Sequence, residues 1–145
     1  NLFNSVSAYG VGYHRHMAEI DQELSIASKK KVNVLFTPHL IPMFRGILST
    51  IYLQTKKKNT AEKVYKFLKN YHRKNFFIKF AKFNSSIGTG DVMNTNFCKI
   101  SVCKDRKSSN IIILSAIDNL IKGASGQAVQ NMNAAFNLKE TMGLR

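Results

Sequence analysis

Residues 97–117 read Phe-Cys-Lys-Ile-Ser-Val-Cys-Lys-Asp-Arg-Lys-Ser-Ser-Asn-Ile-Ile-Ile-Leu-Ser-Ala-Ile, and this stretch decides the fold class of the chain. Its two ends, 97–103 and 111–117, are rich in β-branched and apolar residues, whereas the segment between them is entirely polar. Two such runs joined by a short polar segment are typical of a β-hairpin. The stretch therefore predicts a pair of antiparallel strands.

The rest of the chain alternates between two hydrophobic periods. Residues that alternate between apolar and polar, or that are rich in β-branched types, predict strands at 32–36, 47–53 and 76–80. Apolar residues that recur every three or four positions predict helices at 17–29, 60–73 and 118–136. Strands interleaved with helices, with a hairpin near the end, indicate an α+β domain. We expect a mixed, mostly antiparallel sheet with helices on one face.

Polar residues predict where two of the helices begin. Asn59, which ends a polar turn at 56–59 and has Glu62 three residues further on, is placed to cap the helix at 60–73. Asp118 is placed in the same way before the last helix. In both positions a side-chain oxygen can accept a hydrogen bond from a backbone N–H that has no partner within the helix.

Length and composition exclude several classes of protein. The chain has 145 residues, about the size of one domain, and its 44% hydrophobic content is enough for a core. No apolar run approaches the roughly 18 residues that a membrane span needs, and the sequence shows no secretory signal. Two cysteines are too few for a disulfide scaffold. We expect a cytoplasmic protein, organellar in a eukaryote, that does not bind membranes.

Positive charge is concentrated in one part of the chain. Of a formal net charge of +14, residues 29–82 carry +13, with Glu62 as their only acid. A basic block of this kind raises a nucleic-acid-binding module as an alternative function. However, seventeen of the 22 basic residues are lysine, whereas recognition of phosphates and bases favours arginine. We therefore favour a solvated lysine surface and expect no specific nucleic-acid partner.

A His-x-His pair follows a glycine-containing loop at 9–13 and precedes the predicted helix at 17–29. On a strand, His14 and His16 would share a face and could chelate a metal. A zinc site would need a third ligand, for which the nearest candidates are His39, Glu19 and Asp21. Structural loop histidines are the simpler interpretation of the spacing, and we expect no metal. Glu19 is one helical turn beyond Arg15 and His16 and could pair with either.

Arg45 and the two cysteines are the other candidates for chemistry. Arg45 belongs to an Arg-Gly turn, and its planar guanidinium suits a carboxylate or a phosphate, although a surface salt bridge explains it equally well. Cys98 and Cys103 are five residues apart in or beside a strand, so they face opposite sides. Neither has a neighbouring histidine or helix N-terminus, which favours structural thiols over a nucleophile.

Three blocks, in the same order along the chain, carry a family resemblance. Residues 9–24 read Tyr-Gly-Val-Gly-Tyr-His-Arg-His-Met-Ala-Glu-Ile-Asp-Gln-Glu-Leu, and residues 36–50 read Phe-Thr-Pro-His-Leu-Ile-Pro-Met-Phe-Arg-Gly-Ile-Leu-Ser-Thr. The third block, 116–133, begins Ala-Ile-Asp-Asn-Leu-Ile-Lys-Gly-Ala-Ser-Gly-Gln, and Glu-Thr-Met-Gly-Leu follows at 140–144. Together they resemble N-acetyl-gamma-glutamyl-phosphate reductases, whose signature is HRHTPEI-Q-L. The chain departs from that pattern at Met17-Ala18, Phe44 and Asn137.

The resemblance implies an NADPH-dependent enzyme of arginine biosynthesis. Such an enzyme reduces N-acetyl-glutamyl 5-phosphate to N-acetyl-glutamate 5-semialdehyde and releases phosphate. The implied fold is like the C-terminal catalytic and dimerisation domain of glyceraldehyde-3-phosphate-dehydrogenase-like reductases, in a homo-oligomer (dimer or tetramer). The family's glycine-rich dinucleotide turn and its nucleophilic Gly-Cys-Tyr-Pro-Thr motif are absent from these residues. We therefore expect the C-terminal part of a longer reductase, inactive alone, with NADP bound mainly by the missing half.

The same resemblance implies roles for individual residues. His14 is expected to be the acid–base group near the nucleophilic cysteine, with His16 as the second candidate. Three side chains are expected to hold the substrate's carboxylate or phosphate, or to orient the histidines: Arg15, Glu19 and Arg45. Asn119 is expected to contact the nicotinamide.

The expected domain organisation has two parts. Residues 1–117 would form the substrate and catalytic-histidine domain, and a C-terminal helix within 118–145 would pack on the cofactor-binding domain. A non-catalytic dimerisation domain is a further alternative for the function of the chain.

Overall fold

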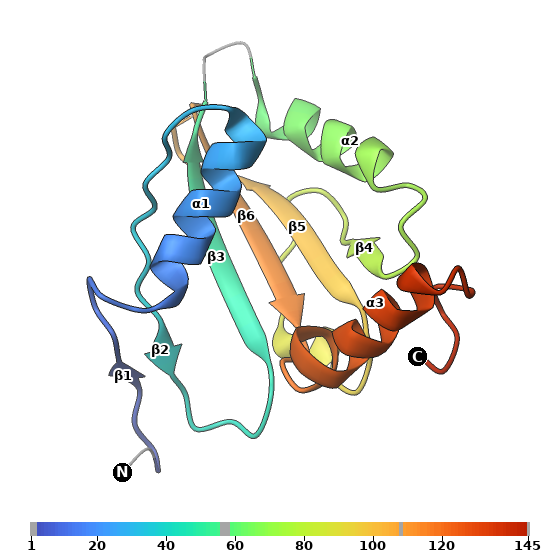
Figure 1. Cartoon of the computed structure of the whole chain (residues 1–145). Helices are drawn as coiled ribbons and strands as arrows, with labels where there is room; N and C mark the ends of the chain where they lie inside the picture. The colour runs from blue at the N-terminus through green and yellow to red at the C-terminus, as the bar shows by residue number, and fades with distance from the viewer. Residues whose placement is uncertain (1–2, 56–58, 108, 145) are drawn as a thin grey trace. The chain divides into compact units, whose positions relative to one another are not determined.

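A computed structural model of the chain describes residues 3–55, 59–107 and 109–144 (Figure 1). The chain forms two compact units, Asn1–Phe44 and Arg45–Arg145. The second unit holds both the main sheet and the C-terminal helix, so the units divide at a different place from the boundary expected after residue 117. In the part of the chain that the structure describes, no helix is long and apolar enough to cross a membrane.

The second unit is built on a four-stranded sheet in the order β3-β6-β5-β4 (Figure 1). β6 (Asn110–Ile117) is an inner strand and pairs antiparallel with both β3 (Ile47–Gln54) and β5 (Cys98–Lys104). β4 (Ile78–Phe80) pairs parallel with β5. The apolar run of β6 fits its inner position, because the strand has a neighbour on each side and its residues are buried or half-buried along its whole length. The predicted hairpin and the mixed, mostly antiparallel sheet are confirmed.

The core of this unit lies between the sheet and α2 (Ala61–Tyr71). Ala61 of the helix packs with Val102 of β5 and Ile111 of β6, and both strand residues are fully buried. Around them pack five partly buried side chains: Val64, Tyr65, Leu68, Phe83 and Ile113. Burying a valine or isoleucine side chain contributes about 1.5–3 kcal/mol, so this contact is a principal reason why α2 stays on the sheet.

The start of α2 differs from the prediction by one residue. Thr60, not Asn59, is the N-cap, because its extended backbone lets its hydroxyl accept a hydrogen bond from the N–H of Lys63 at 3.3 Å. Glu62 does not reach back to form a capping box but pairs with Lys104, at 3.1 Å. Most of the polar turn predicted at 56–59 lies outside the described residues.

The segment after β6 is not the single helix predicted at 118–136. It consists of a π-helical turn η2 (Ile121–Ser125) followed by α3 (Gly126–Ala135). Ala124, near the end of η2, has non-helical dihedral angles (φ −147°, ψ −105°), so the chain turns there before α3 begins. Asp118 does act as a cap, but for the η2 turn, since its Oδ1 accepts hydrogen bonds from the N–H groups of Leu120 and Ile121. A short 3₁₀ turn, η1 (Thr89–Asp91), precedes β5.

The first unit contains α1 (His16–Ser28) and a two-stranded pair, β1 (Ser7–Ala8) with β2 (His39–Leu40). The helix predicted at 17–29 is confirmed. The strand predicted at 32–36 is wrong, although its alternating side chains are alternately half-buried and exposed. Side chains of α1 satisfy its backbone instead: Val32 N–H donates to Ser25 Oγ at 2.9 Å, and Val34 N–H donates to Asp21 Oδ1 at 2.8 Å.

Candidate functional site

The half-buried His14 lies at the centre of an aromatic cluster in the first unit. Its ring meets Tyr9 and Phe36 edge-on, with centroids 5.2 Å and 5.4 Å away. The ring of His16 is 4.9 Å away, so the structure brings both predicted histidines together. The Nδ1 atom of His14 accepts a hydrogen bond from the backbone N–H of His16 at 3.3 Å. His14 is therefore oriented from three sides.

A glycine makes room for this ring. Gly10 has a positive φ of 58°, and a Cβ built there would lie 2.9 Å from Cδ2 of His14. The carbonyl of Gly10 accepts a hydrogen bond from the N–H of Tyr13 at 3.1 Å, which closes a tight turn just before the histidine. An L-residue at position 10 would be strained in its backbone and would push against the imidazole. Gly10 is thus a local determinant of where His14 sits.

Arg15 and Glu19 lie near these histidines in sequence, and both are exposed. Arg15 occupies the N-cap position of α1 without a side-chain capping bond. Within the described residues no ion pair joins Glu19 to Arg15 or His16, so the pairing expected from the sequence is not formed. Nor do three His, Cys, Asp or Glu side chains of the described residues gather closely enough to hold a metal ion.

Arg45, at the start of the second unit, is held by a buried carboxylate. Its Nη1 atom lies 3.0 Å from Oδ2 of Asp118 and 2.8 Å from Oδ1 of Asn94. The side chain of Asp118 is fully buried, whereas that of Arg45 is 21% exposed. Arg45 therefore does form a salt bridge, as the sequence allows. The bridge is not a surface pair, however, because its other partner, Asp118, is buried. Asp118 joins Arg45 to the end of β6 and the start of η2.

Hydrogen bonds explain how Asp118 stays charged inside the protein. Burial by itself would raise the pKa of Asp118, but the backbone N–H groups of Asn94, Leu120 and Ile121 and the Arg45 guanidinium outweigh it. The pKa of this carboxyl is therefore below its ordinary value. Each of its two oxygens accepts two hydrogen bonds, which is the condition under which a buried carboxylate is tolerated.

Asn119 is next to this carboxylate and faces the Arg-Gly turn. Its Oδ1 accepts a hydrogen bond from the N–H of Gly46 at 2.6 Å. Gly46 has a φ of 119°, and a Cβ there would lie 2.6 Å from Cβ of Thr89. The structure thus brings together two residues that were predicted independently, Arg45 and Asn119, through the neighbours Gly46 and Asp118. His14 and His16 lie in the other unit.

Sequence reasoning missed a polar network on α3. Gln130 accepts hydrogen bonds through Oε1 from Lys122 Nζ (2.7 Å) and Asn96 Nδ2 (2.9 Å), and it donates to Glu140 Oε1 at 2.6 Å. Burial lowers the pKa of Lys122, although Cys98 and Glu140 act in the opposite direction. The signal was present in the sequence, because the last helix of a small domain contains four polar residues, Gln127, Gln130, Asn131 and Asn133, and those that are buried need partners.

The two cysteines are free, half-buried thiols. Cys98 Sγ lies 3.4 Å from Ser115 Oγ, and Cys103 Sγ lies 3.5 Å from the carbonyl oxygen of Ser85. Among the described residues no histidine is bonded to either sulfur. These contacts agree with the structural role favoured for both.

Comparison with known sequences identifies the family. The profile described as "Semialdehyde dehydrogenase, dimerisation domain" matches residues 1–119. An N-acetyl-gamma-glutamyl-phosphate reductase from Afipia carboxidovorans is 48% identical over 99% of this chain and 42% of its own length. Enzymes of the same name from Thermoanaerobacter sp. and Staphylococcus aureus are 46% and 42% identical over 97% of this chain and 41% of theirs. The chain thus spans about two fifths of the length of these curated relatives.

Solved structures show the same fold at lower identity. Aspartate semialdehyde dehydrogenase II from Vibrio cholerae superposes with a TM-score of 0.68 at 21% identity, over 87% of this chain and 38% of that one. Aspartate semialdehyde dehydrogenase from Francisella tularensis superposes with a TM-score of 0.72 at 14% identity, over 94% and 40%. The fold class expected from the resemblance is confirmed. Because the family profile matches most of the chain, residues 1–119, the chain belongs to the semialdehyde dehydrogenase dimerisation-domain family.

Proposed function

We propose that this chain is the C-terminal part of an NADPH-dependent reductase of arginine biosynthesis, located in the cytoplasm or in an organelle. The proposed reaction converts N-acetyl-glutamyl 5-phosphate into N-acetyl-glutamate 5-semialdehyde and phosphate. The observation that carries the proposal is the 42–48% identity between nearly the whole chain and curated enzymes of that name. The ordered cluster around His14 supports it, because such a reaction needs a positioned acid–base group.

The proposed chemistry assigns a proton-transfer role to His14. By resemblance, a cysteine thiolate of the Gly-Cys-Tyr-Pro-Thr motif attacks the acyl carbon, and phosphate leaves as the thioester forms. NADPH supplies the hydride for reduction when it is bound. The oxygen on the reduced carbon then needs a proton, and the donor takes a proton back when the carbon–sulfur bond breaks and the semialdehyde departs. Imidazole suits both transfers because it titrates near neutral pH.

One hydrogen bond indicates which nitrogen of His14 would serve. Its Nδ1 accepts from the backbone N–H of His16. In the neutral ring the proton therefore resides on Nε2, since a nitrogen that accepts carries no hydrogen. We assign the proton transfers to Nε2, with the imidazolium as the donor; in that form Nδ1 also carries a proton and gives up the hydrogen bond from His16. The edges of Tyr9 and Phe36 restrict rotation of the ring and keep that nitrogen in place.

Arg15, Glu19 and Arg45 are proposed to hold the substrate's carboxylate or phosphate, or to orient the histidines. Arg45 is the best supported of the three, because Asp118 and Asn94 fix the orientation of its guanidinium. A guanidinium that is already oriented loses less conformational entropy when it binds an anion.

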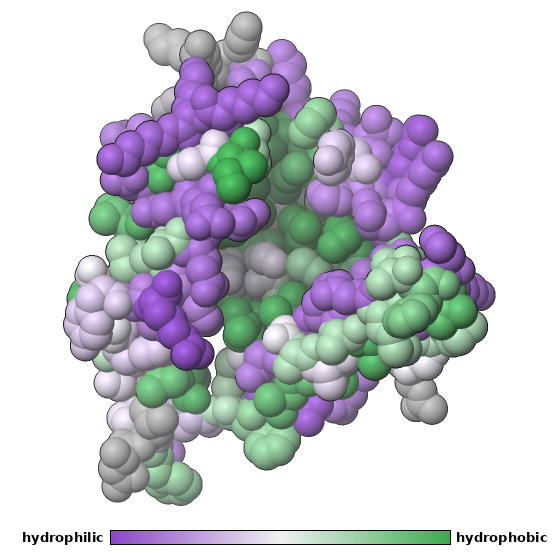
Figure 2. Space-filling view, viewed as in Figure 1, coloured by the Kyte–Doolittle hydropathy of each residue, from purple (hydrophilic) through white to green (hydrophobic). Residues whose placement is uncertain are grey.

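The residues of this chain fit only an edge of the nicotinamide cofactor. No glycine-rich dinucleotide turn is present in the sequence, so the cofactor would be held mainly by other residues of the complete enzyme. Asn119 fits a contact with the nicotinamide, because its oxygen is taken by Gly46 N–H and its amide nitrogen can still donate. Hydrophobic side chains gather on the visible surface of α3 (Figure 2). Met132 of α3 and Phe136, the residue after the helix, are 48% and 73% exposed. This surface supports the prediction that 118–145 packs on a cofactor-binding domain.

Kinetics of the complete enzyme test these assignments. We expect His14→Asn to lower kcat and kcat/KM together by about 10²–10⁴-fold with little change in KM, as for a lost acid–base group. Arg45→Lys keeps a charge beside Asp118 but loses the planar fork, and we expect it chiefly to raise KM. A His14 variant with normal kcat beside an inactive His16→Asn variant would transfer the role to His16. Normal activity in both would remove this segment from the chemistry.

We also propose that the complete enzyme is a homo-oligomer that uses this sheet. β3 is an edge strand whose apolar side chains are exposed on both faces, including Leu48 at 47%, Ile51 at 42% and Tyr52 at 76%. Exposed edges of this kind are normally covered in a native assembly. Sedimentation velocity should show a dimer or tetramer that dissociates in a Leu48→Glu, Tyr52→Glu variant. An unchanged assembly would move the interface elsewhere.

A further inference from the structure

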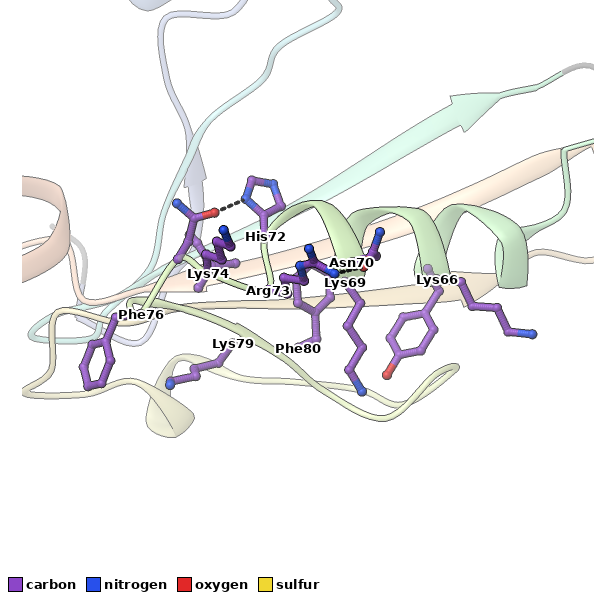
Figure 3. A pocket seen from close by; sticks show the side chains of 12 residues that line it. Lys66, Lys69, Asn70, His72, Arg73, Lys74, Phe76, Lys79 and Phe80 are labelled. Atoms are coloured by element: carbon purple, nitrogen blue, oxygen red, sulfur yellow. Dashed lines mark hydrogen bonds between the residues drawn. The ribbon is translucent and has the colours of Figure 1, made fainter.

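A basic groove runs along the second unit beside the C-terminal half of α2 (Figure 3). It has a volume of about 800 Å³ and lies between the helix, the turn that follows it, and β4. Its cations come from all three: Lys66 and Lys69 from the helix, Arg73 and Lys74 from the turn, and Lys79 from the strand. None of these residues belongs to the clusters around His14 or Asp118.

The cations of the basic groove are exposed, and within the described residues none of them has an acidic partner. All five are exposed to solvent, and in the described part of the chain no carboxylate forms an ion pair with any of them. Glu62 is the only acid between residues 60 and 82, and it is paired with Lys104. Five like charges around one hollow repel each other, so an anion bound there would relieve that repulsion.

Aromatic rings lie among these cations. Tyr65, Phe76 and Phe80 line the basic groove, and Phe76 is 50% exposed. Lys79 Nζ lies 4.7 Å from the ring centroid of Phe76 and 4.8 Å from that of Phe97, so one lysine rests against two rings. A cation beside an exposed aromatic ring offers one contact for a phosphate and another for a base.

The shape of the basic groove favours a chain of phosphates over a single small molecule. Pockets for small ligands enclose most of the ligand's surface, whereas here every charged group is exposed. From Lys66 to the end of α2 at Tyr71 the helical rise is roughly 7.5 Å, and Arg73 follows in the turn, so the charges extend further than one phosphate. Four of the five cations are lysines, which contact phosphates without reading base edges.

From these observations we infer that the basic groove binds single-stranded nucleic acid without sequence preference, its cations on the phosphates and Phe76 stacked on a base. The concave surface disfavours a membrane, which would meet a protruding apolar face. An acidic peptide would use the lysines but would leave the aromatic ring without a stacking partner. This binding is separate from the proposed reductase reaction and consistent with the absence of a recognition motif.

The salt dependence of nucleic-acid affinity, measured with the complete protein, tests the contribution of the groove's cations. For single strands the slope of log K against log salt is about −0.7 per phosphate contact, so five contacts predict about −3.5 and an affinity loss of roughly 100-fold between 50 and 200 mM salt. We expect a Lys66→Gln, Arg73→Gln, Lys79→Gln variant to bind oligouridine at least tenfold more weakly at 50 mM, with a slope near −1.4.

A matched control removes three charges elsewhere: Arg106→Gln, Lys107→Gln, Lys139→Gln. These side chains are exposed and lie outside the basic groove. We expect the control variant to keep most of the affinity and the slope of the parent. Equal losses in the groove variant and the control variant would show a diffuse electrostatic attraction and overturn the site. Reductase activity of the groove variant should equal that of the parent, so failure of either proposal is visible independently.

A second variant tests whether a base stacks on Phe76. Phe76→Leu keeps an apolar side chain but removes the ring, so binding of oligouridine should weaken about fivefold or more. Binding of inorganic polyphosphate, which has no bases, should not change. Thermal melting of each variant establishes that it is folded. If Phe76→Leu leaves oligouridine binding unchanged, or if anionic vesicles or polyglutamate bind while oligouridine does not, the inference is refuted.

Discussion

Asp118→Asn is the substitution whose effect the structure defines most sharply. Oδ2 of Asp118 accepts hydrogen bonds from the N–H of Asn94 at 2.9 Å and from Nη1 of Arg45 at 3.0 Å. Oδ1 accepts from the N–H groups of Leu120 and Ile121 at 2.9 Å and 3.2 Å. An asparagine is the same size but has only one acceptor oxygen. In either orientation of its amide, two donors lose their acceptor and face an NH₂ group.

The loss in stability of Asp118→Asn follows from these two lost hydrogen bonds. A hydrogen bond to a charged group contributes about 1.5–3 kcal/mol, so two lost bonds amount to roughly 3–6 kcal/mol, close to the usual cost of about 3–5 kcal/mol for breaking a buried ion pair from one side. With Asp118 replaced, the positive charge of Arg45 loses its buried counterion. Since domains of this size are stable by about 5–15 kcal/mol, the variant should be severely destabilised.

Urea unfolding of the chain at several pH values measures the effect. The pKa of Asp118 is below its ordinary value of 3.8 in the folded state, so its stabilising charge is fully present above about pH 5. That contribution is lost as the pH falls through the lowered pKa. We therefore expect the free-energy difference between parent and Asp118→Asn to be constant from pH 5 to 8 and to shrink below pH 4.

Asp91→Asn is the matched control, because Asp91 is also paired with a cation, Lys99 at 3.3 Å, but lies on the surface. Its effect on the free energy of unfolding should be small and should fall with added salt. A change below 1 kcal/mol in Asp118→Asn, or a difference from the parent that does not depend on pH in acid, would refute the role assigned to this carboxylate.

Three further predictions concern packing and activity. Gly126→Ala places a methyl group 2.7 Å from Cγ2 of Ile121, so the free energy of unfolding measured in urea should fall by about 1–3 kcal/mol. An unchanged urea midpoint would mean that α3 can move away from Ile121 at no cost. Gly10→Ala in the complete enzyme should lower kcat about 10–100-fold, because the new methyl group displaces the ring of His14. Thermal melting verifies that the variant is folded, and a normal kcat would show that the position of this ring is not critical. The isolated chain should show only background NADPH oxidation with the acyl-phosphate substrate, and turnover above a variant lacking both cysteines would show that one of them is the nucleophile.

Local patterns in the sequence were sufficient for most of the elements. The hairpin at 97–117, α2 and α1 form where period and β-branched content place them, because neighbouring residues decide whether a helix or a strand is favoured. Local pattern failed at 32–36, where the alternation is present but α1 side chains take the backbone hydrogen bonds. It failed again at 118–136, where Ala124 interrupts the helix. At 32–36 the competing contacts come from Ser25 and Asp21, which the local window does not contain.

The candidate site was likewise predicted only in part from the sequence. The His-Arg-His block, the Arg-Gly turn and the family resemblance were legible from the amino-acid sequence, because each is a short run of adjacent residues. Only the tertiary structure could join Arg45 to Asp118, 73 residues later in the chain, or place Phe76 among the lysines that line one groove. Hydrogen bonds and charges act over a few ångströms in space, and folding alone decides which distant residues come within that range.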